Sequence, residues 1–496
     1  MVKKLKIDIN SETMDIVSSE QLTLLQYLRQ NGLTGTKEGC ASGDCGACTV
    51  LLCDKEAEAP FITVNSCITP LLQLTGKQVI TVEGLTAGPR LHVVQQQLIE
   101  KHGSQCGFCT PGFVMSLAAW LENRSCEQGT MIQAPAQALR AEVVEAISGN
   151  LCRCTGYKPI IEAGMAAALE IAETGSRFQS LASLTGDIPG HMDAEQSVSV
   201  AAGEGVKKAP IMMRPGSLKE LDASLMRWPQ ARLCAGGTDL LLEKTQQGKP
   251  LDCLLSCLGV KEMNACSISE KALLIGAAAS YSVIEQYCQS IWPDLGQFLK
   301  RFGSPQIRNR ATLGGNLATA SPVGDMSPLL MVMNASVILR SAQGVERSIA
   351  VSEFFKGYRQ TVLNDGEYIR AVSIGLEAFN GFRRFFKNSK RTMDDISTVM
   401  GAFYLDVSSS RVREARIAYG GLAAMPIRVK AVEDFLVGKE LNQASISRAQ
   451  ALLKEVINPL SDVRASADYR SHIAASMLSR ALREQSGGIL PAVTVG

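Results

Sequence analysis

The first eighty-five residues combine strand-like and helical hydrophobic patterns. Residues 4–10 alternate, with apolar side chains at positions 5, 7 and 9 and polar ones between them, which predicts a half-buried strand. Residues 22–30 place leucines three apart and predict a helix that ends near Gly32. Strand-like segments follow at 49–52 and 61–64. We therefore expect a small α+β domain over residues 1–85.

Residues 86–172 have helical spacing instead. Apolar residues recur at i, i+3 and i+7 from Leu91, and the same spacing joins Val144, Ile147 and Leu151. A third stripe runs from Ile161 to position 171, and residues 113–121 read as a further helix. These patterns predict a small four-helix bundle.

The rest of the chain indicates two more domains after a linker. Residues 173–207 lose all periodicity and are rich in Gly, Ser, Ala and Asp, as in an interdomain linker. Residues 208–380 mix short strands, glycine turns and helices, which favours an α/β domain. Residues 381–496 begin strand-like and then predict helices over 446–457 and 469–483. The fold class expected for the whole chain is multidomain α+β.

Composition excludes some classes of protein. A chain of 496 residues exceeds what one hydrophobic core organises, and its net charge of +2 makes no case for binding nucleic acid or an anionic membrane. No uninterrupted apolar run approaches the length that spans a bilayer. Residues 1–10 carry lysines but no apolar signal segment. We expect a cytoplasmic protein.

Cysteine is the residue type that changes this picture. Eight of the fifteen cysteines form two groups of closely spaced members, both before residue 155. Free cysteine behaves as a small buried hydrophobe, so we expect the scattered remainder to fill cores. The scattered cysteines are Cys53, Cys126, Cys234, Cys253, Cys257, Cys266 and Cys288.

The first group has the spacing C-x4-C-x2-C-x18-C. Its members are Cys40, Cys45, Cys48 and Cys67. Three thiolates from one loop can converge only if the chain doubles back, which glycines at 39, 43 and 46 allow. This spacing is that of plant-type [2Fe–2S] clusters. The alternatives are a zinc site, which usually shows two C-x2-C pairs, or uncoordinated core cysteines.

The second group consists of a C-x2-C pair and a C-x-C pair. Its members are Cys106, Cys109, Cys152 and Cys154, with 42 residues between the pairs. Pro111 and Pro159 follow the pairs and mark helix starts, where the helix dipole stabilises a thiolate. By itself this group could bind zinc or act as a redox dithiol. The adjacent plant-type group favours a second [2Fe–2S] cluster, because two redox centres form a path for electrons.

Two glycine segments are candidates for a flavin diphosphate. The strand before Ala235 runs into a Gly-Gly turn, where missing side chains let backbone N–H groups approach an anion; the candidates there are Ala235, Gly236, Gly237, Thr238, Asp239 and Leu240. The second segment, about eighty residues on, offers Gly315, Asn316, Thr319, Ser321 and Asp325. Neither is the dinucleotide GxGxxG, and ordinary loop chemistry is the alternative for each side chain. Together they suit an FAD held between two α/β lobes.

At this point the motifs resemble a known family. The Cys40–Cys48 loop, QCGFCTPG at 105–112 and CRCTGY at 152–157 resemble the iron–sulfur part of the molybdenum hydroxylases, which include xanthine dehydrogenase, aldehyde oxidase and carbon monoxide dehydrogenase. ATLGGNLATASPVGDMSPL at 311–329 and KNSKRTMDDI at 387–396 are similar to the flavin domain of xanthine dehydrogenase. The resemblance implies a ferredoxin-like β-grasp domain (1–85), a four-helix [2Fe–2S] domain (86–172), a two-lobed FAD domain of the vanillyl-alcohol-oxidase type (208–380) and a C-terminal domain of the CO-dehydrogenase flavoprotein type (381–496).

The resemblance also implies roles for single residues. Phe302 would lie near the isoalloxazine, Thr312 and Asp325 on the nucleotide part, and Ile369 and Lys387 along the site. Gln105 would touch a pterin, while Tyr358, Arg391, Asp394 and Asp395 would meet NAD. The family more commonly has Arg-Arg-Glu-Asp-Asp where this chain has Arg-Thr-Met-Asp-Asp at 391–395, a departure that bears on NAD recognition.

The function that the resemblance implies is electron transfer in an NAD-dependent xanthine dehydrogenase. A molybdopterin domain needs several hundred further residues, so we expect it on a partner subunit, in a heterotetramer with two copies of each chain. Electrons would pass through both clusters to FAD and then NAD, and no residue here does acid–base work on the purine. The alternatives are the same role with an aldehyde or aromatic acyl-CoA substrate, a non-enzymatic redox carrier, or a zinc-dependent scaffold.

Overall fold

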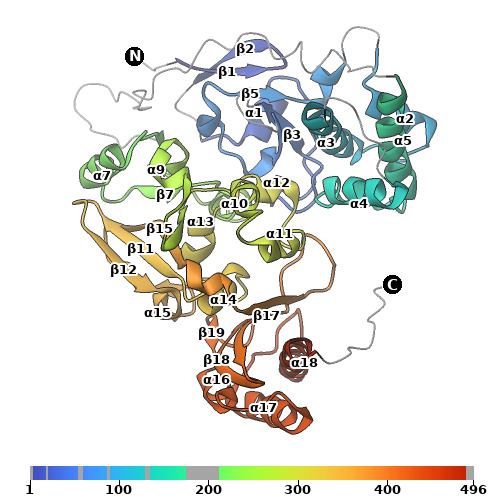
Figure 1. Ribbon diagram of the computed structural model, residues 1–496. Helices are drawn as coiled ribbons and strands as arrows, with labels where there is room; N and C mark the ends of the chain where they lie inside the picture. Colours follow the sequence, from blue (N-terminus) through green and yellow to red (C-terminus); the bar gives the residue numbers. More distant parts are fainter. Residues whose placement is uncertain are drawn as a thin grey trace. The chain divides into compact units, whose positions relative to one another are not determined.

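The computed structural model describes residues 4–17, 21–53, 60–86, 90–128, 135–174 and 212–487 (Figure 1). It divides into two compact units, of which one holds residues Met1–Lys261 and Gly303–Ala311. The other holds Glu262–Phe302 and Thr312–Gly496. We call them the N-terminal and C-terminal units. Apart from its first two residues, which end a helix, the expected linker at 173–207 lies outside the described residues.

The N-terminal unit begins with a five-stranded sheet in the order β2-β1-β5-β3-β4. The strands are β1 (Lys4–Ile9), β2 (Glu12–Val17), β3 (Thr49–Cys53), β4 (Phe61–Asn65) and β5 (Gln78–Ile80), and only the β1–β5 pair is parallel. Helix α1 (Leu24–Gln30) starts after Thr23, whose side chain forms a capping box with Gln26. The expected strands and helix are confirmed, and the cap explains why the helix starts two residues late.

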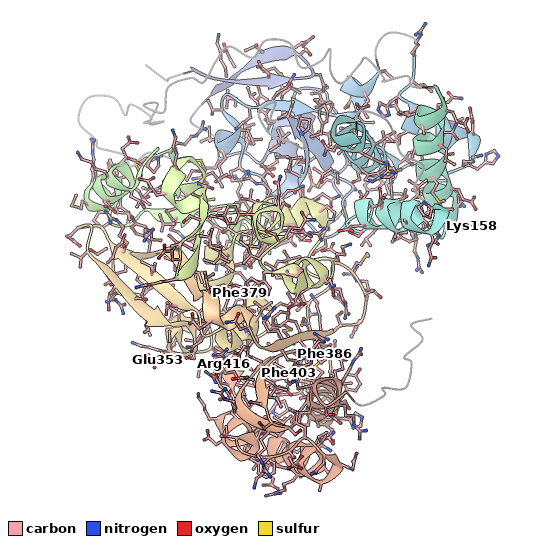
Figure 2. All side chains as sticks on the ribbon, viewed as in Figure 1. Lys158, Glu353, Phe379, Phe386, Phe403 and Arg416 are labelled. Carbon is pink, nitrogen blue, oxygen red and sulfur yellow. The ribbon has the colours of Figure 1, made fainter. Side chains whose placement is uncertain are left out.

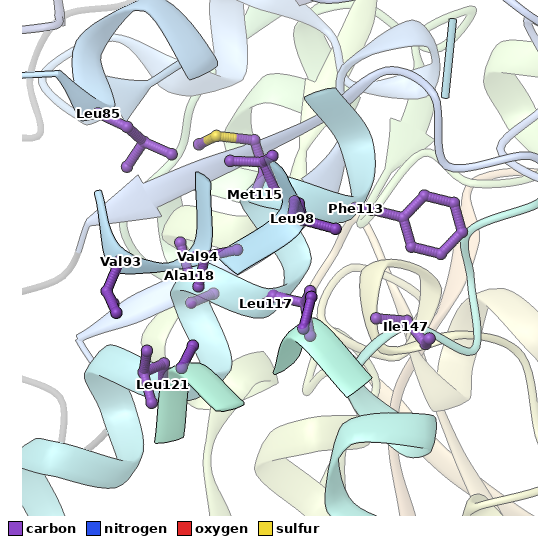
Figure 3. Close-up of a cluster of buried hydrophobic side chains, with 14 of the residues drawn as sticks. Leu85, Val93, Val94, Leu98, Phe113, Met115, Leu117, Ala118, Leu121 and Ile147 are labelled. Carbon is purple, nitrogen blue, oxygen red and sulfur yellow. The ribbon is translucent and has the colours of Figure 1, made fainter. Parts of the chain in front are cut away.

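Four helices follow, as expected. They are α2 (Val93–Glu100), α3 (Thr110–Gln128), α4 (Ala136–Ala146) and α5 (Lys158–Thr174). Leu98, Phe113 and Leu117 lie in their shared core (Figure 3). One expectation is wrong: the helix through Val144 does not continue to Leu151 but ends at Ala146. The backbone N–H of Leu151 instead donates to the carbonyl oxygen of Cys45, outside the bundle.

The remainder of the N-terminal unit is a small parallel sheet with short helices. Strands β6 (Met212–Met213), β8 (Leu254–Ser256) and β7 (Arg232–Cys234) lie in that order. Helices α7 (Leu218–Arg227) and α8 (Leu240–Thr245) accompany the sheet, and α12 (Pro305–Arg308) packs against β4. Residues distant in sequence therefore join the first sheet.

The C-terminal unit contains an antiparallel five-stranded sheet in the order β12-β11-β15-β10-β9. Its strands are β9 (Cys266–Ile268), β10 (Ala272–Gly276), β11 (Ser336–Ser341), β12 (Glu346–Ala350) and β15 (Glu367–Gly375). The helices of this part are α10 (Tyr281–Cys288), α11 (Pro293–Leu299), α13 (Leu313–Ala318), α14 (Met326–Val332) and α15 (Val351–Phe354). Helix α13 packs on β15.

The last part of that unit is a four-stranded meander covered by helices. Strands β16 (Phe382–Asn388), β17 (Val399–Ser408), β18 (Arg411–Gly420) and β19 (Ile427–Arg428) are joined in sequence order. Helices α16 (Lys430–Leu436), α17 (Gln443–Val456) and α18 (Ala467–Gln485) follow, which confirms the two expected helices. Phe386 and Phe403, labelled in Figure 2, pack with ring centroids 5.8 Å apart. Among the described residues, no helix is both long and apolar enough to cross a membrane.

Candidate functional site: two cysteine tetrads and two glycine segments

The first cysteine group lies in the loop between α1 and β3, with its fourth member in a short 3-10 helix (Ser66–Ile68) after β4. The chain doubles back through Gly43 and Gly46, whose φ angles are +85° and +65°. A Cβ on Gly39 would lie only 2.8 Å from the Sγ of Cys45. The three glycines singled out in the sequence are therefore needed for conformation at two positions and for space at the third.

Interactions between neighbouring thiols connect all four cysteines of this group. Hydrogen bonds from Cys45 and Cys67 hold the pKa of Cys40 far below its ordinary value, and the bond to Cys40 raises the pKa of Cys45. A hydrogen bond from the Cys67 side chain likewise lowers the pKa of Cys48. Such a shared set of protons is displaced when metal binds, because a coordinating thiol is deprotonated outright. The donor set fits a cluster of two irons, each of which takes two of the cysteines.

The second cysteine group lies at two helix starts. Cys109 directly precedes α3, and Cys152 precedes α5 by one loop. The Sγ of Cys152 accepts a hydrogen bond from the backbone N–H of Thr155 at 3.4 Å and lies 3.2 Å from its hydroxyl. Burial opposes ionisation of Cys152, but these bonds outweigh it and lower the pKa of the thiol. These hydrogen bonds come from the loop before α5, whereas the sequence predicted stabilisation by the helix start itself.

Contacts across the two segments pair the cysteines of this second group. The thiols of Cys154 and Cys106 share a hydrogen bond, and so do those of Cys109 and Cys152. Burial, together with that bond, raises the pKa of the Cys109 thiol to about 12. Among the described residues, no three His, Cys, Asp or Glu side chains are placed to hold a single metal ion. Two pairs of thiols suit two irons better than the one tetrahedral centre of zinc.

The two tetrads differ in exposure. Cys48 and Cys67 are buried and the other two members of the first tetrad half-buried. In the second tetrad, by contrast, Cys106 and Cys154 are exposed. The second tetrad is thus the one open at the surface of the N-terminal unit.

The first glycine segment belongs to the N-terminal unit and joins β7 to α8. Gly237 has a φ of +82°, and a Cβ on Gly236 would lie 1.6 Å from the carbonyl oxygen of Arg310. Gln73 donates to the carbonyl oxygen of Ala235 at 2.8 Å, and the buried Arg310 donates to that of Gly236 at 3.1 Å. The absence of a side chain at 236 is therefore required by the protein's own backbone.

The second glycine segment belongs to the C-terminal unit and, unlike the first, is helical. Thr312 is the N-cap of α13, and its hydroxyl accepts from the N–H of Gly315 at 3.1 Å. Gly314 approaches Ala277 too closely to bear a side chain, whereas Gly315 is exposed. The Oδ1 of Asn316 is buried and, within the described residues, has no hydrogen-bond partner. An orphan acceptor beside an exposed glycine fits a polar ligand group here.

Two FAD candidates of the C-terminal unit, Asp325 and Lys387, lie in one buried cluster. Lys387 donates to the Oδ2 of Asp325 at 2.8 Å, and the Ser397 hydroxyl donates to its Oδ1. The hydroxyl of Tyr281 is also buried, and burial followed by the charge of Asp325 raises its pKa well above the ordinary value. Within the described residues this hydroxyl has no hydrogen-bond partner.

The remaining candidates of this unit lie around that cluster or on its sheet. Phe302 packs against Tyr281 with ring centroids 4.4 Å apart. Ile369 is buried in β15, on which α13 packs. Thr319 and Ser321 make local bonds, the first donating to the carbonyl oxygen of Asn316 and the second accepting from a backbone N–H.

The loop expected to meet NAD is closed by its own contacts. Asp395 accepts from the backbone N–H of Arg391 at 2.8 Å, and the Arg391 guanidinium donates to the carbonyl oxygen of Asp394 at 2.8 Å. Tyr358 is 61% exposed. Arg301, which the sequence did not single out, donates to the carbonyl oxygens of Lys387 and Thr392. It thereby holds the start of this loop, a role no local pattern could reveal.

Most cysteines outside the tetrads fill cores as expected. Cys53, Cys234, Cys253, Cys257 and Cys288 are buried, and Cys266 is half-buried. The side chain of Cys126 lies outside the described residues.

Four family models match consecutive parts of the chain. They describe a 2Fe-2S iron-sulfur cluster binding domain (7–72), a [2Fe-2S] binding domain (81–165), an FAD binding domain in molybdopterin dehydrogenase (205–376) and a CO dehydrogenase flavoprotein C-terminal domain (384–485). The chain corresponds to the iron–sulfur and FAD portion of a molybdenum hydroxylase. The expected α+β fold class, the two [2Fe–2S] domains and the FAD domain are confirmed.

The proteins similar to this chain include longer sequences and a solved structure that matches part of it. Xanthine dehydrogenase 2 of Arabidopsis thaliana is 32% identical over 87% of this chain, and aldehyde oxidase 2 of Cavia porcellus is 30% identical over 93%. The chain spans 36% and 38% of those two proteins. A chain of quinoline 2-oxidoreductase from Pseudomonas putida 86 matches with a TM-score of 0.52 and 29% identity, covering 57% of this chain and 99% of its own.

Proposed function

We propose that this chain is the iron–sulfur and FAD subunit of a xanthine dehydrogenase. It would carry electrons from a molybdopterin-binding partner subunit through two [2Fe–2S] clusters to FAD and then to NAD. The observation that carries the proposal is the identity of 32% to a xanthine dehydrogenase over 87% of this chain, against 30% to the aldehyde oxidase. The solved quinoline 2-oxidoreductase chain matches little more than half of it.

The eight tetrad cysteines would hold the clusters, and the second tetrad would receive the electrons. Its Cys106 and Cys154 are exposed, and the side chains of Phe108 and Leu151 beside it are 48% and 40% exposed. An apolar rim around a redox centre suits a protein partner. Gln105, also exposed, would be the residue nearest the partner's pterin.

In the C-terminal unit, FAD would be held by the second glycine segment and the buried cluster around Asp325. In the N-terminal unit, the first glycine segment is a separate candidate for contact with the FAD diphosphate. Gly237 and Gly315 are backbone positions that a diphosphate can approach, and the orphan Oδ1 of Asn316 accepts a ligand donor. A flavin is chemically necessary in this proposal, since clusters carry single electrons whereas NAD takes two.

The proposal is tested with the complex purified anaerobically together with its partner. Iron, FAD and molybdenum are measured first, and xanthine or NADH is then added while the flavin and cluster absorbances are followed. Bleaching by both reagents supports a xanthine dehydrogenase. Bleaching by NADH alone contradicts the purine assignment. Bleaching by neither reagent contradicts the enzyme and supports an electron carrier instead.

An aldehyde substrate is the second candidate, because the aldehyde oxidase relative aligns over nearly the whole chain. The substrate pocket would belong to the partner, so this chain's residues serve both reactions equally. Replacing xanthine by an aromatic aldehyde or an aromatic acyl-CoA in the same experiment separates these candidates.

A further inference from the structure

A buried polar network connects the two cysteine loops within the N-terminal unit. We propose that Gln306, with Asn150 and Ser116, is a clamp that sets the spacing and the electronic coupling of the two clusters. The clamp rests on the proposed function, since it presupposes that both tetrads carry clusters. Gln306 would be a positioning residue, acting through the loops and touching neither cluster.

The two loops meet through backbone atoms. The N–H of Leu151, next to ligand Cys152, donates to the carbonyl oxygen of ligand Cys45 at 3.0 Å. This one hydrogen bond joins a residue of the first tetrad to the chain of the second. Because electron tunnelling weakens exponentially with distance, the length of such a bridge governs how fast the clusters exchange electrons.

Glycines make this approach possible. A Cβ on Gly46 would lie 2.3 Å from the carbonyl oxygen of Gly149, and a Cβ on Gly112 would lie 2.2 Å from that of Gly46. The loops and the start of α3 therefore pack backbone against backbone, with the amide of Asn150 also beside Gly46 and Gly112.

Asn150 and Ser116 hold these backbones in register. The Asn150 amide donates to the carbonyl oxygen of Gly46 at 3.1 Å, and its Oδ1 accepts from the Ser116 hydroxyl at 2.7 Å. Thr49, at the start of β3, also donates to Gly46, at 2.6 Å. Strand β3, helix α3 and the loop before Cys152 thus each contribute one polar side chain to the network.

Gln306 enters this network from a remote segment. It lies on α12, and its Nε2 lies 3.1 Å from the Ser116 hydroxyl, 3.2 Å from that of Thr49 and 3.3 Å from the Oδ1 of Asn150. The side chain is fully buried. Its Oε1 has no hydrogen-bond partner within the described residues.

Contacts on both sides fix α12 over the loops. The Arg308 guanidinium reaches the carboxylate of Glu145 on α4 at 3.3 Å. Asn309 donates to the carbonyl oxygen of Thr63 on β4 at 2.9 Å. Since one contact goes to the helical bundle and the other to the sheet, α12 ties the two cluster-bearing domains together at the point where Gln306 enters.

The test compares Gln306→Met with Gln97→Met in the dithionite-reduced complex. Methionine keeps the length of glutamine and removes its hydrogen bonds. Gln97 is a matched control, because it is also buried with an unpartnered Oε1, yet it bonds to Glu100 and Glu170, away from both loops. Low-temperature electron paramagnetic resonance of the two reduced clusters reports their magnetic coupling, and rapid-mixing reduction reports the exchange rate.

In Gln306→Met we expect both cluster signals to persist, with weaker magnetic splitting and several-fold slower exchange, while Gln97→Met resembles the unmodified protein. Splitting and exchange equal to those of Gln97→Met would overturn the clamp. If Gln306→Met does not fold, Ser116→Ala is measured in its place. A smaller change in the same direction supports the clamp, and no change overturns it. Absence of two cluster signals in the unmodified protein would contradict the proposed function instead.

Discussion

Lys387 and Asp325 form an ion pair, 2.8 Å long, in which both side chains are almost completely buried. Ser397 donates to the same carboxylate. The pair joins β16 to the start of α14, two elements that are far apart in sequence. In such surroundings the two charges depend on each other, because neither can be solvated alone.

Replacing one partner of this pair should destabilise the C-terminal unit strongly. Lys387→Met leaves Asp325 buried and unpaired, and we expect a loss of about 3–5 kcal/mol in the free energy of unfolding, measured by urea denaturation. The double variant Lys387→Met with Asp325→Asn should recover much of it. Lys430→Met is the control, because Lys430 is 65% exposed and its partner Glu433 keeps Arg428. Equal losses in the two lysine variants would contradict this account.

Gly46 should be irreplaceable for a reason beyond its φ angle. Gly46→Ala and Gly32→Ala both place a side chain at positive φ, a strain of about 1–3 kcal/mol each. Only at Gly46 does the new Cβ meet other atoms, since nothing lies within 4 Å at Gly32. We expect Gly46→Ala to lose iron per chain and Gly32→Ala to retain it. Retention of full iron in both would refute close packing of the loops.

FAD binding should respond to a side chain at Gly315 with little effect on folding. Gly315 is exposed, and a Cβ there would meet only the Thr312 hydroxyl, at 3.0 Å. Gly315→Ala should therefore melt like the unmodified protein but bind FAD more weakly. Flavin fluorescence measures this, because the variant should release FAD at a higher protein concentration when it is diluted. Gly357→Ala, where a Cβ has ordinary contacts only, is the control. Unchanged FAD retention would remove this glycine from the site.

Removal of iron should expose cysteines in a definite order. After chelation under reducing conditions, iodoacetamide should label the exposed Cys106 and Cys154 first. Cys234 and Cys257 should stay unlabelled in the folded chain, since burial raises their pKa values to about 11 and about 12. Peptide mass spectrometry measures the order. The iron-loaded protein is the control, and rapid labelling of its Cys106 would argue against coordination there.

Acid should weaken one surface contact of the C-terminal unit. Hydrogen bonding to Arg347 lowers the pKa of Glu367 from 4.5 to about 2. A lowered folded-state pKa stabilises the protein above the unfolded value, and the gain is lost as pH falls from about 4.5 towards 2. Glu367→Gln should therefore lower the unfolding midpoint at pH 7, with a difference that shrinks below pH 4.5. Glu455→Gln, in an exposed pair with Arg448, should show a smaller difference at pH 7.

Much of the molecule follows from local sequence. The alternation at 4–10, the leucine spacing at 22–30 and the apolar stripes of α2, α3 and α5 predicted elements that the structure contains. The cysteine spacings and the glycine at 43 predicted the first tetrad's loop, because ligand spacing and backbone freedom are properties of a few adjacent residues. The length of α4 was not predictable in this way, since Leu151 continues the apolar spacing yet bonds to Cys45.

The partners of remote residues were decided by tertiary structure alone. Gln306, Arg310 and Gln73 are ordinary polar residues in the sequence, but folding buries them among the cysteine loops and the first glycine segment. The sequence marked Gly236 as a place where a ligand approaches, whereas it is the backbone of Arg310 that approaches it. Sequence by itself determined which atoms could bind iron and how the nearby chain bends. Which distant backbone fills the space beside them depends on long-range packing, and no local pattern encodes that.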